Sequence, residues 1–309
     1  MSVVVPMLNE EHSIYSLLDE ITIVFSSLPN KTYEVIVVDD GSTDNSSKKV
    51  QEYSRINNFV HLIRLRRCFG QTAAMAAGID NSNGDVIVTL DADGQNDPGD
   101  IPRVLDKFAE GFDCVSGRRV NRKDRFLTRK LPSSVANWII RKVTRINIHD
   151  FGCTLKAYNG EMLRSIPLYG DMHRLLPFYM KLAGGSITEI KVNHRPRKYG
   201  VSKYGIARTL RVINDLVVAK VQGSFFSRPM HLFGNLGIGL LFFASMMISG
   251  AIYMKITGKS DFIESPLLLI AGVFFLSGLQ IIFTGLLAEI ILRRFSFASN
   301  EQRYIIIRE

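Results

Sequence analysis

The stretch GDVIVTLDADGQNDP, residues 84–98, decides how this chain folds. Residues 86–90 are rich in β-branched side chains and follow a Gly-Asp turn, which predicts a short buried strand. Asp91 and Asp93 come where that strand ends and the chain turns through Gly94. Two carboxylates this close repel each other, and oxygen ligands of this kind suit Mg²⁺ or Mn²⁺. The sequence therefore predicts a divalent metal site here, with a solvated aspartate-rich turn as the alternative.

Two upstream segments also end a strand on polar residues, YEVIVVDDGSTD at 33–44 and SVVVPMLNEE at 2–11. Helical patterns alternate with these strands, which predicts a doubly wound, mostly parallel α/β sheet. Ligands of open α/β sheets bind beyond the carboxyl ends of the strands, so we expect one nucleotide crevice there. GxGxxG and GxxxxGK[ST] are both absent from this region, which argues against a dehydrogenase and a P-loop enzyme.

The charge of the chain is strongly uneven. The net charge of the 309 residues is +9, but residues 1–117 hold 9 basic and 18 acidic side chains, while residues 118–230 hold 23 basic and 6 acidic ones. The acidic part contains the predicted metal site. The basic part must face an anionic partner, either nucleic acid or lipid phosphate.

Two uncharged segments favour lipid over nucleic acid. Residues 232–254 and 266–288 are each 23 residues long without a formal charge. Each is long enough to cross a hydrocarbon core of roughly 30 Å as a helix, whereas the alternative is a pair of core helices in a soluble domain. The larger excess of Lys and Arg lies outside the connecting loop, so we expect an integral membrane protein with both termini and the large domain in the cytoplasm.

Four regions are expected along the chain. Residues 1–203 form the catalytic domain, 204–229 a juxtamembrane helix, 230–292 the two spans and 293–309 a cytoplasmic segment ending in a strand. Within them, 131–146 and 204–222 have the pattern of basic amphipathic helices, typical of a membrane interface; 131–146 could equally cap the sheet. The apolar tail at 303–308 is expected to pair with a sheet of its own or of a neighbouring protomer, which favours a homo-oligomer.

Four motifs in this order carry a resemblance to a known family. PMLNEE, VVDDGSTD, LDADGQNDP and the GVSKYG of residues 200–205 resemble the inverting GT-A glycosyltransferases of family 2. Within them the chain is most similar to the polyisoprenyl-phosphate hexosyltransferases, such as dolichyl-phosphate mannose synthase and the bactoprenol glucosyltransferases. The resemblance implies inverting transfer of a hexose from a nucleoside-diphosphate sugar to polyprenyl phosphate. The two-span layout makes UDP-glucose and undecaprenyl phosphate the first choice, with GDP-mannose and other donors still open.

The resemblance and the charge pattern assign roles to individual residues. The metal ligands are expected to be Asp91, Asp93 and, by resemblance, Gln95, and the metal would bridge the pyrophosphate of the donor. The nucleotide-sugar site is expected to comprise Pro6, Asn9, Glu10, Asp39, Asp91, Gln95, Arg118, Ser202 and Lys203. The acceptor phosphate is expected to meet Arg122, Arg129, Arg141, Arg195 and Lys198. Arg119 belongs with Arg118 and Arg122 as a phosphate-binding candidate, and the alternatives are solvated arginines and, at 195–205, a plain basic linker.

Asp150 and Asp93 are the expected catalytic residues. Asp150 matches the position of the family's acceptor-side aspartate, but the Ser-Gly-Phe-Arg run common after it is replaced by Gly152-Cys153-Thr154-Leu155-Lys156. Its expected role is to orient the attacking phosphate or stabilise the sugar. The nucleophile is already an anion at neutral pH, so it needs positioning more than it needs a base.

Three rival functions have discriminating features. Processive polysaccharide synthases carry a QxxRW motif, which is absent here. A membrane-anchored nucleotide-sugar sensor would not need both a metal site and a basic acceptor region. Nucleic-acid binding is disfavoured because the basic region adjoins two apolar segments.

Overall fold

The structure is a computed structural model that describes residues 1–28, 32–120, 141–142, 146–196, 229–258 and 266–297. It divides into two compact units, one of residues 1–219 and 302–309 and the other of residues 220–301. The predicted amphipathic helix at 204–222 and the predicted strand at 303–308 lie outside the described residues. The predicted helix at 131–146 also lies outside them, apart from residues 141, 142 and 146.

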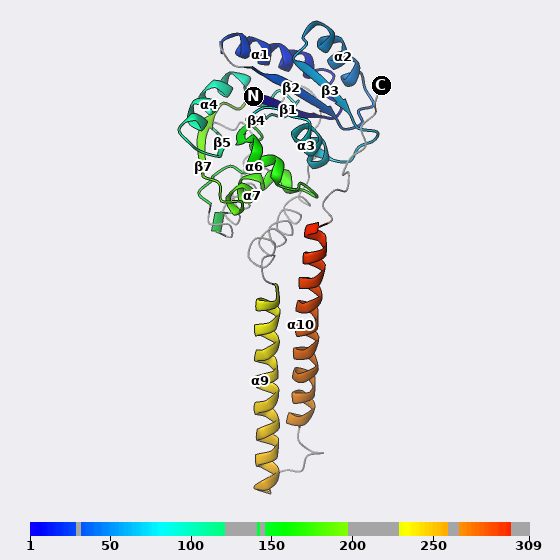
Figure 1. The fold of residues 1–309 in the computed structure, drawn as a ribbon, viewed down its shortest axis with the longest axis vertical. Coiled ribbons are helices and arrows are strands. Elements are labelled where there is room, and N and C mark those ends of the chain that lie inside the picture. The colour runs from blue at the N-terminus through cyan, green and yellow to red at the C-terminus, as the bar shows by residue number, and fades with distance from the viewer. Residues whose placement is uncertain (29–31, 121–140, 143–145, 197–228, 259–265, 298–309) are drawn as a thin grey trace. The chain divides into compact units, whose positions relative to one another are not determined.

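The first unit is built on a seven-stranded mixed sheet (Figure 1). Its strands are β1 (Ser2–Met7), β2 (Glu34–Asp39), β3 (Val60–Arg64), β4 (Val86–Thr89), β5 (Cys114–Arg119), β6 (Lys156–Asn159) and β7 (Ile187–Val192). They lie in the order β3-β2-β1-β4-β6-β5-β7. β6 runs antiparallel to both of its neighbours, and the other pairings are parallel. The predicted mostly parallel α/β sheet is confirmed.

Helices cover both faces of the sheet (Figure 1). They are α1 (Ile14–Ser26), α2 (Ser46–Ile56), α3 (Gln71–Asp80), α4 (Ile101–Ala109), α6 (Gly160–Ser165) and α7 (Leu176–Leu182), with 3₁₀ turns η1 (Pro98–Asp100) and η3 (Met172–Arg174). Because side chains alternate along a strand, Val3 and Val5 of β1 pack with α1, α2 and α4, whereas Val4 packs with α3, α6 and α7. β1 is therefore buried on both faces, as expected of a central parallel strand.

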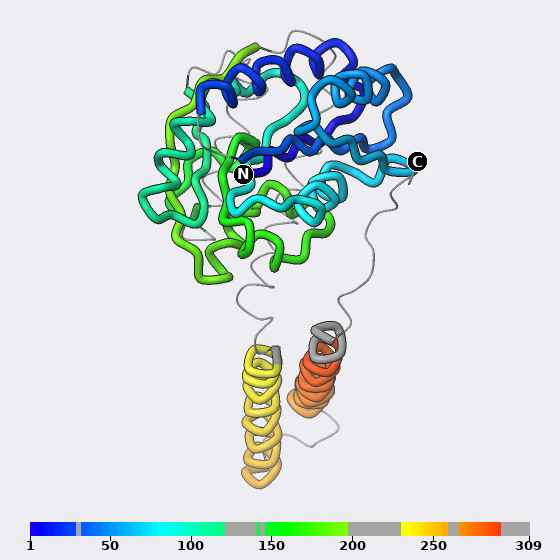
Figure 2. The backbone as a smooth tube through the Cα atoms, turned by 45° about the horizontal axis from the view of Figure 1, so that its top comes forward, coloured from blue at the N-terminus to red at the C-terminus, as the bar shows by residue number. Residues whose placement is uncertain are grey.

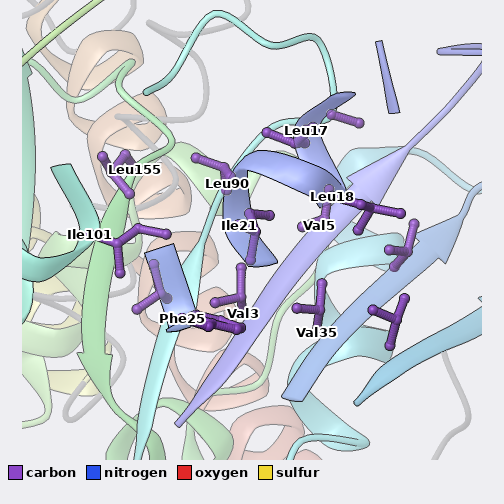
Figure 3. Close-up of a cluster of buried hydrophobic side chains, with 14 of the residues drawn as sticks. Val3, Val5, Leu17, Leu18, Ile21, Phe25, Val35, Leu90, Ile101 and Leu155 are labelled. Carbon is purple, nitrogen blue, oxygen red and sulfur yellow. The ribbon is translucent and has the colours of Figure 1, made fainter. Parts of the chain in front are cut away.

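The face with α1 holds the larger core. Figure 3 shows Leu17, Leu18, Ile21 and Phe25 of α1 beside Val3 and the other strand valines. On the opposite face, α3 lies so close to β1 that a Cβ at Gly78 would be 2.4 Å from Val4 Cγ1. These two layers hold the ends of β1, β2 and β4 in fixed positions relative to one another.

The second unit is a pair of long helices, α9 (Pro229–Ile256) and α10 (Pro266–Phe297), which run side by side (Figure 2). Within them, the segments Met230–Ile256 and Pro266–Ile291 are long and apolar enough to cross a membrane, with mean hydropathies of 1.9 and 2.3. Only 17% and 11% of their most apolar windows are buried, which does not fit core helices of a soluble domain. Both predicted segments, 232–254 and 266–288, fall within them.

Glycines set the spacing of α9 and α10. A Cβ at Gly237 would lie 2.8 Å from the carbonyl oxygen of Gly278, and one at Gly285 would lie 2.5 Å from Phe233 Cβ. Small residues allow backbones to approach closely where no hydrophobic effect drives helices together, as in a bilayer. The packing of this pair therefore suits a lipid environment.

Candidate active site

The carboxyl ends of β1, β2 and β4 meet at one edge of the sheet. Met7 of β1 is the register partner of Asp39 of β2, and Val4 of β1 is the partner of Thr89 of β4. All three strands are parallel, so the residues that follow them emerge on the same side. The segments that the sequence assigned to a nucleotide crevice are thus brought together.

The ends of β1 and β2 are tied to each other by hydrogen bonds. The Asn9 backbone, held at a φ of 54°, donates to Ser42 Oγ at 2.9 Å, and Thr43 N donates to Asn9 Oδ1 at 2.8 Å. Glu10 N donates to Ser46 Oγ at 2.8 Å. Asn9 and Glu10 therefore lie where β1 ends, bonded to the segment that follows β2, and their contact with a nucleoside stays a prediction.

Asp39 and Pro6 are buried near the carboxyl ends of β2 and β1. Asp39 is buried; its Oδ1 accepts from Ser42 N at 2.8 Å, and its Oδ2 accepts from the Ser47 hydroxyl. Pro6 is buried inside β1, one residue before the strand ends. The hydrogen bonds of Asp39 shape the turn after β2, and the expected contact of Asp39 and Pro6 with a nucleoside stays a prediction.

Asp40 is a site-shaping residue that the sequence analysis missed. It is buried, and its carboxylate accepts from Phe69 N at 2.7 Å and from Gly70 N at 2.9 Å. These bonds fix the turn that begins α3, and α3 in turn carries Gln71 to the Asp91 carboxylate. The sequence signal was the second aspartate of VVDD. It directly follows a buried strand, and a carboxylate that is buried there needs hydrogen-bond donors.

Asp91 and Asp93 follow β4 at the same edge. Gln71 Nε2 donates to Asp91 Oδ1 at 2.8 Å, and Gln95 N donates to Asp93 Oδ1 at 3.1 Å. Burial of its carboxyl group, together with the negative charge of Asp93, raises the pKa of Asp91 to about 7. The hydroxyl of Thr154 and the charges of Arg119 and Lys156 oppose that rise.

The residues present fit a divalent cation. Asp91 and Asp93 repel each other, and a bound cation would stabilise both as anions. Among the described residues, no three His, Cys, Asp or Glu side chains form a metal cluster. Mg²⁺ commonly takes one or two carboxylates and completes its shell with substrate phosphates and water, so Asp91 and Asp93 are sufficient protein ligands.

The raised pKa of Asp91 predicts a pH-dependent stability in metal-free buffer. The folded state holds a proton at Asp91 that the unfolded state has lost between pH 4 and 7, so stability should fall as the pH rises through that window. Asp91→Asn has no carboxyl group to ionise in this window, so its free energy of unfolding should exceed that of the wild type by about 1–3 kcal/mol at pH 8. One pKa unit corresponds to about 1.4 kcal/mol. At pH 4 the two proteins should be alike.

Thermal unfolding in detergent with EDTA, from pH 4 to 8, measures this effect. Asp106→Asn is the matched control, since Asp106 is an exposed carboxylate on α4. An Asp91→Asn protein that gains no stability between pH 4 and 8 would contradict the raised pKa.

The segment after β7 is hydrogen-bonded to the loop that follows β4, residues 90–100. Asn193 N donates to Asp100 Oδ2 at 2.6 Å, His194 forms a β-bridge with Asn96, and Arg195 N donates to Gln95 O at 2.8 Å. The loop that carries Asp93 and Gln95 is thereby held at its middle and at its C-terminal end.

Arg195 was expected to bind the acceptor phosphate, and the structure places it differently. Its guanidinium contacts Glu20 Oε2 at 2.6 Å and Asp97 Oδ1 at 2.9 Å. Two carboxylates already neutralise this cation. Through them Arg195 joins α1 to the loop that follows β4. The geometry favours a structural role for Arg195 over a phosphate contact.

Asp150 forms a two-pronged ion pair with Arg119, and both side chains are largely buried. Arg119 Nε donates to Asp150 Oδ2 at 2.7 Å and Nη2 donates to Oδ1 at 2.8 Å. Gly152 makes room for the pair, because a Cβ there would lie 2.9 Å from Arg119 Nη2. Asp150 therefore orients an arginine in this chain, whose Gly152-Cys153-Thr154-Leu155-Lys156 stands where the family commonly has Ser-Gly-Phe-Arg.

Arg118 points to a different partner from Arg119. Its Nη1 lies 3.3 Å from Glu189 Oε1, and 43% of its side chain is exposed. The same carboxylate accepts from His149 N at 2.7 Å and contacts His149 Nδ1 at 2.6 Å. His149 is thus held by the Glu189 carboxylate through its backbone and its ring, and Arg118 keeps enough exposure to meet a phosphate.

The remaining residues that were expected to bind phosphate lie wholly or partly outside the described part of the chain. Arg122, Arg129, Lys198, Ser202 and Lys203 lie outside the described residues, and Arg141 is described without the residues that precede it. Their assignments stay predictions. The sequence analysis gave no role to Gln71 or Lys156. For Lys156, the available signal was a lysine that directly follows Leu155 and begins a strand, β6.

A mixed α/β sheet with paired carboxylates at its central strand ends defines a nucleotide-sugar glycosyltransferase of the GT-A type. The chain belongs to glycosyl transferase family 2, whose model matches residues 2–166. The expected family is confirmed, and the protein is a glycosyltransferase.

Two relatives match almost the whole chain. It is 39% identical to the dodecaprenyl-phosphate galacturonate synthase of Rhizobium johnstonii, over 99% of this chain and 91% of that protein. It is 34% identical to the undecaprenyl-phosphate 4-deoxy-4-formamido-L-arabinose transferase of Proteus mirabilis, over 99% and 92%.

Solved structures share the fold. Glucosyl-3-phosphoglycerate synthase from Mycobacterium tuberculosis in complex with phosphoglyceric acid superposes with a TM-score of 0.54 at 19% identity, covering 72% of this chain and 79% of that one. The same enzyme in complex with Mn²⁺ and UDP-glucose gives 0.52 at 18% identity, with 72% and 78% covered.

Proposed function

We propose that this protein transfers a sugar from a nucleoside-diphosphate sugar to the phosphate of a polyprenyl phosphate at the cytoplasmic surface of a membrane. The observation that carries the proposal is the placement of the Asp91–Asp93 pair and the Asp150–Arg119 pair in one unit of a chain that also holds two apolar helices. The relatives named above act on polyprenyl phosphates and match the chain over nearly its full length, which supports a polyprenyl phosphate acceptor.

The roles of the residues follow from their charges. Asp91 and Asp93 would hold Mg²⁺ or Mn²⁺, which when bound neutralises the diphosphate leaving group. Asn9 and Glu10 line the rim where the nucleoside would lie. Arg119, fixed by Asp150, supplies positive charge for a phosphate, and the phosphate nucleophile requires no base because it is already ionised.

Two sugars are candidates for the group that is transferred. Glucose from UDP-glucose is the prediction made from the sequence. Galacturonate is the second candidate, because the relative with that activity is 39% identical over 99% of the chain. Purified protein in detergent, incubated with Mg²⁺ or Mn²⁺, undecaprenyl phosphate and one member of a donor panel, tests both. The panel contains UDP-glucose, UDP-galacturonate, UDP-N-acetylglucosamine, UDP-4-deoxy-4-formamido-arabinose and GDP-mannose.

The same assay separates an enzyme from a membrane-anchored nucleotide-sugar sensor. The enzyme should release nucleotide only when lipid phosphate is present, and the product should be a glycolipid seen by mass spectrometry. Binding of a donor without any lipid-dependent release of nucleotide would overturn the proposal.

The stereochemistry of the product is also predicted. Direct attack by the lipid phosphate on the anomeric carbon breaks the bond to the diphosphate in one displacement and inverts the configuration. A donor with an α linkage should therefore give a β-linked polyprenyl-phosphate sugar. The one-bond C–H coupling of the anomeric carbon in NMR distinguishes the two, and a retained α linkage would require a two-step mechanism.

A further inference from the structure

A row of polar side chains crosses four strands beneath the Asp150 loop. The register pairs Thr89 of β4 with Lys156 of β6, Lys156 with Ser116 of β5, and Ser116 with Glu189 of β7. Directly paired residues on neighbouring strands point to the same face, so these four side chains form one line. The next row on the same face, two residues away along each strand, is apolar and includes Ile87, Tyr158 and Cys114.

Three members of this row bind the backbone of one loop, residues 149–154. Thr89 Oγ1 donates to Thr154 O at 2.6 Å, and Lys156 Nζ donates to Phe151 O at 3.1 Å. Glu189 Oε2 accepts from His149 N at 2.7 Å. The fourth member, Ser116, is fully buried, and its hydroxyl has no hydrogen-bond partner among the described residues. The row thus holds the loop at its start, middle and end.

Lys156 is the member of the row whose burial costs the most free energy, because its ammonium group loses its hydration. It is 2% exposed, and burial lowers its pKa, opposed in part by the charge of Asp150. A buried ammonium group is retained only where it is compensated, and an apolar side chain of the same length would remove the desolvation cost. The compensation here is its bond to the residue after Asp150, with the Asp150 carboxylate nearby.

We propose that Lys156 is a positioning residue for the lipid-phosphate acceptor. It holds the 149–154 loop so that Asp150 fixes Arg119 in the orientation that meets the acceptor phosphate. This inference rests on the proposed function. Lys156 acts through the loop, so its loss should weaken use of the acceptor much more than binding of the nucleotide at Asp91 and Asp93.

Lys156→Met tests the proposal, with Ser116→Ala as the matched control from the same buried row. We expect kcat/KM for undecaprenyl phosphate to fall about tenfold to hundredfold in Lys156→Met, because a misplacement of about 1 Å can cost that much. The Kd for UDP with Mn²⁺ should stay within about threefold of the wild type, because Lys156 bonds Phe151 O, whereas the contact of this loop with Asp91 is made by the hydroxyl of Thr154. Ser116→Ala should match the wild type in both. Thr89→Val, which removes the bond to Thr154 O while keeping the side-chain volume, should show a weaker form of the Lys156→Met defect.

The outcomes are distinguishable. If Lys156→Met fails to fold, as judged by its thermal transition and nucleotide binding, Thr89→Val carries the test. An acceptor kcat/KM within about twofold of the wild type in the folded variants would overturn the inference, and so would an equal loss of nucleotide affinity. No transfer by the wild type with any donor would overturn the proposed function itself, and this inference with it.

Discussion

Asp91→Asn and Asp93→Asn are each expected to lower the rate of sugar transfer by at least about 10²–10³-fold, as expected when charge stabilisation is removed from a leaving group. Each substitution takes one negative charge from the pair that would hold the cation, and the other ligands would come from the substrate. The fold should survive, because neither carboxylate stabilises the core. Asp91→Asn should even raise the stability of the metal-free protein at pH 8, for the reason given above.

The measurement is transfer to undecaprenyl phosphate across a Mn²⁺ titration, beside thermal unfolding of each variant. Both variants should need far more Mn²⁺ than the wild type, or should not respond to it. Asp106→Asn, on the exposed side of α4, should match the wild type in activity. Normal transfer by either variant in metal-free buffer would show that these carboxylates do not bind a catalytic cation.

Local sequence was sufficient for the central strands of the fold. β1, β2 and β4 contain runs of Val and Ile with polar residues at or shortly after their carboxyl ends, and each strand lies within the segment in which that pattern predicted it. β6 could not be predicted in the same way, because KAYN contains no β-branched residue. Its antiparallel insertion between β4 and β5 depends on pairings between residues far apart in the chain. Cys114 pairs with Tyr158, 44 residues away, and Val88 pairs with Ala157, 69 residues away.

The candidate site was predictable where one segment carries the chemistry. Asp91 and Asp93 are two residues apart, and their position after a strand is visible in the sequence. Arg195 shows the limit of that reasoning, since its partner Glu20 lies 175 residues away. A basic residue near a basic loop is indistinguishable, in sequence, from one that is already neutralised by distant carboxylates.

The pairing of Arg119 with Asp150 leads to the second large effect. Arg119→Gln would leave a buried carboxylate without its partner, which commonly costs about 3–5 kcal/mol of stability, and should reduce transfer by about 10²-fold or more. Arg119→Lys keeps the charge but loses the two-pronged geometry, so it should recover stability better than activity. Asp150→Asn keeps one acceptor oxygen but leaves the Arg119 cation without its counter-charge, so its stability should fall between those of Arg119→Lys and Arg119→Gln.

A double-mutant cycle separates orientation from base catalysis. If Asp150 acts by fixing Arg119, Asp150→Asn combined with Arg119→Gln should be little worse than Arg119→Gln alone, because residues that act through one contact are not additive. The pH dependence of kcat in Asp150→Asn should keep the wild-type shape, since no proton passes through the carboxylate. Losses that add fully, together with a lost ionisation in the pH profile, would instead make Asp150 a base that acts independently of Arg119. The buried ion pair observed here, with Arg119 donating from Nε and Nη2 to both oxygens of Asp150, favours the first result.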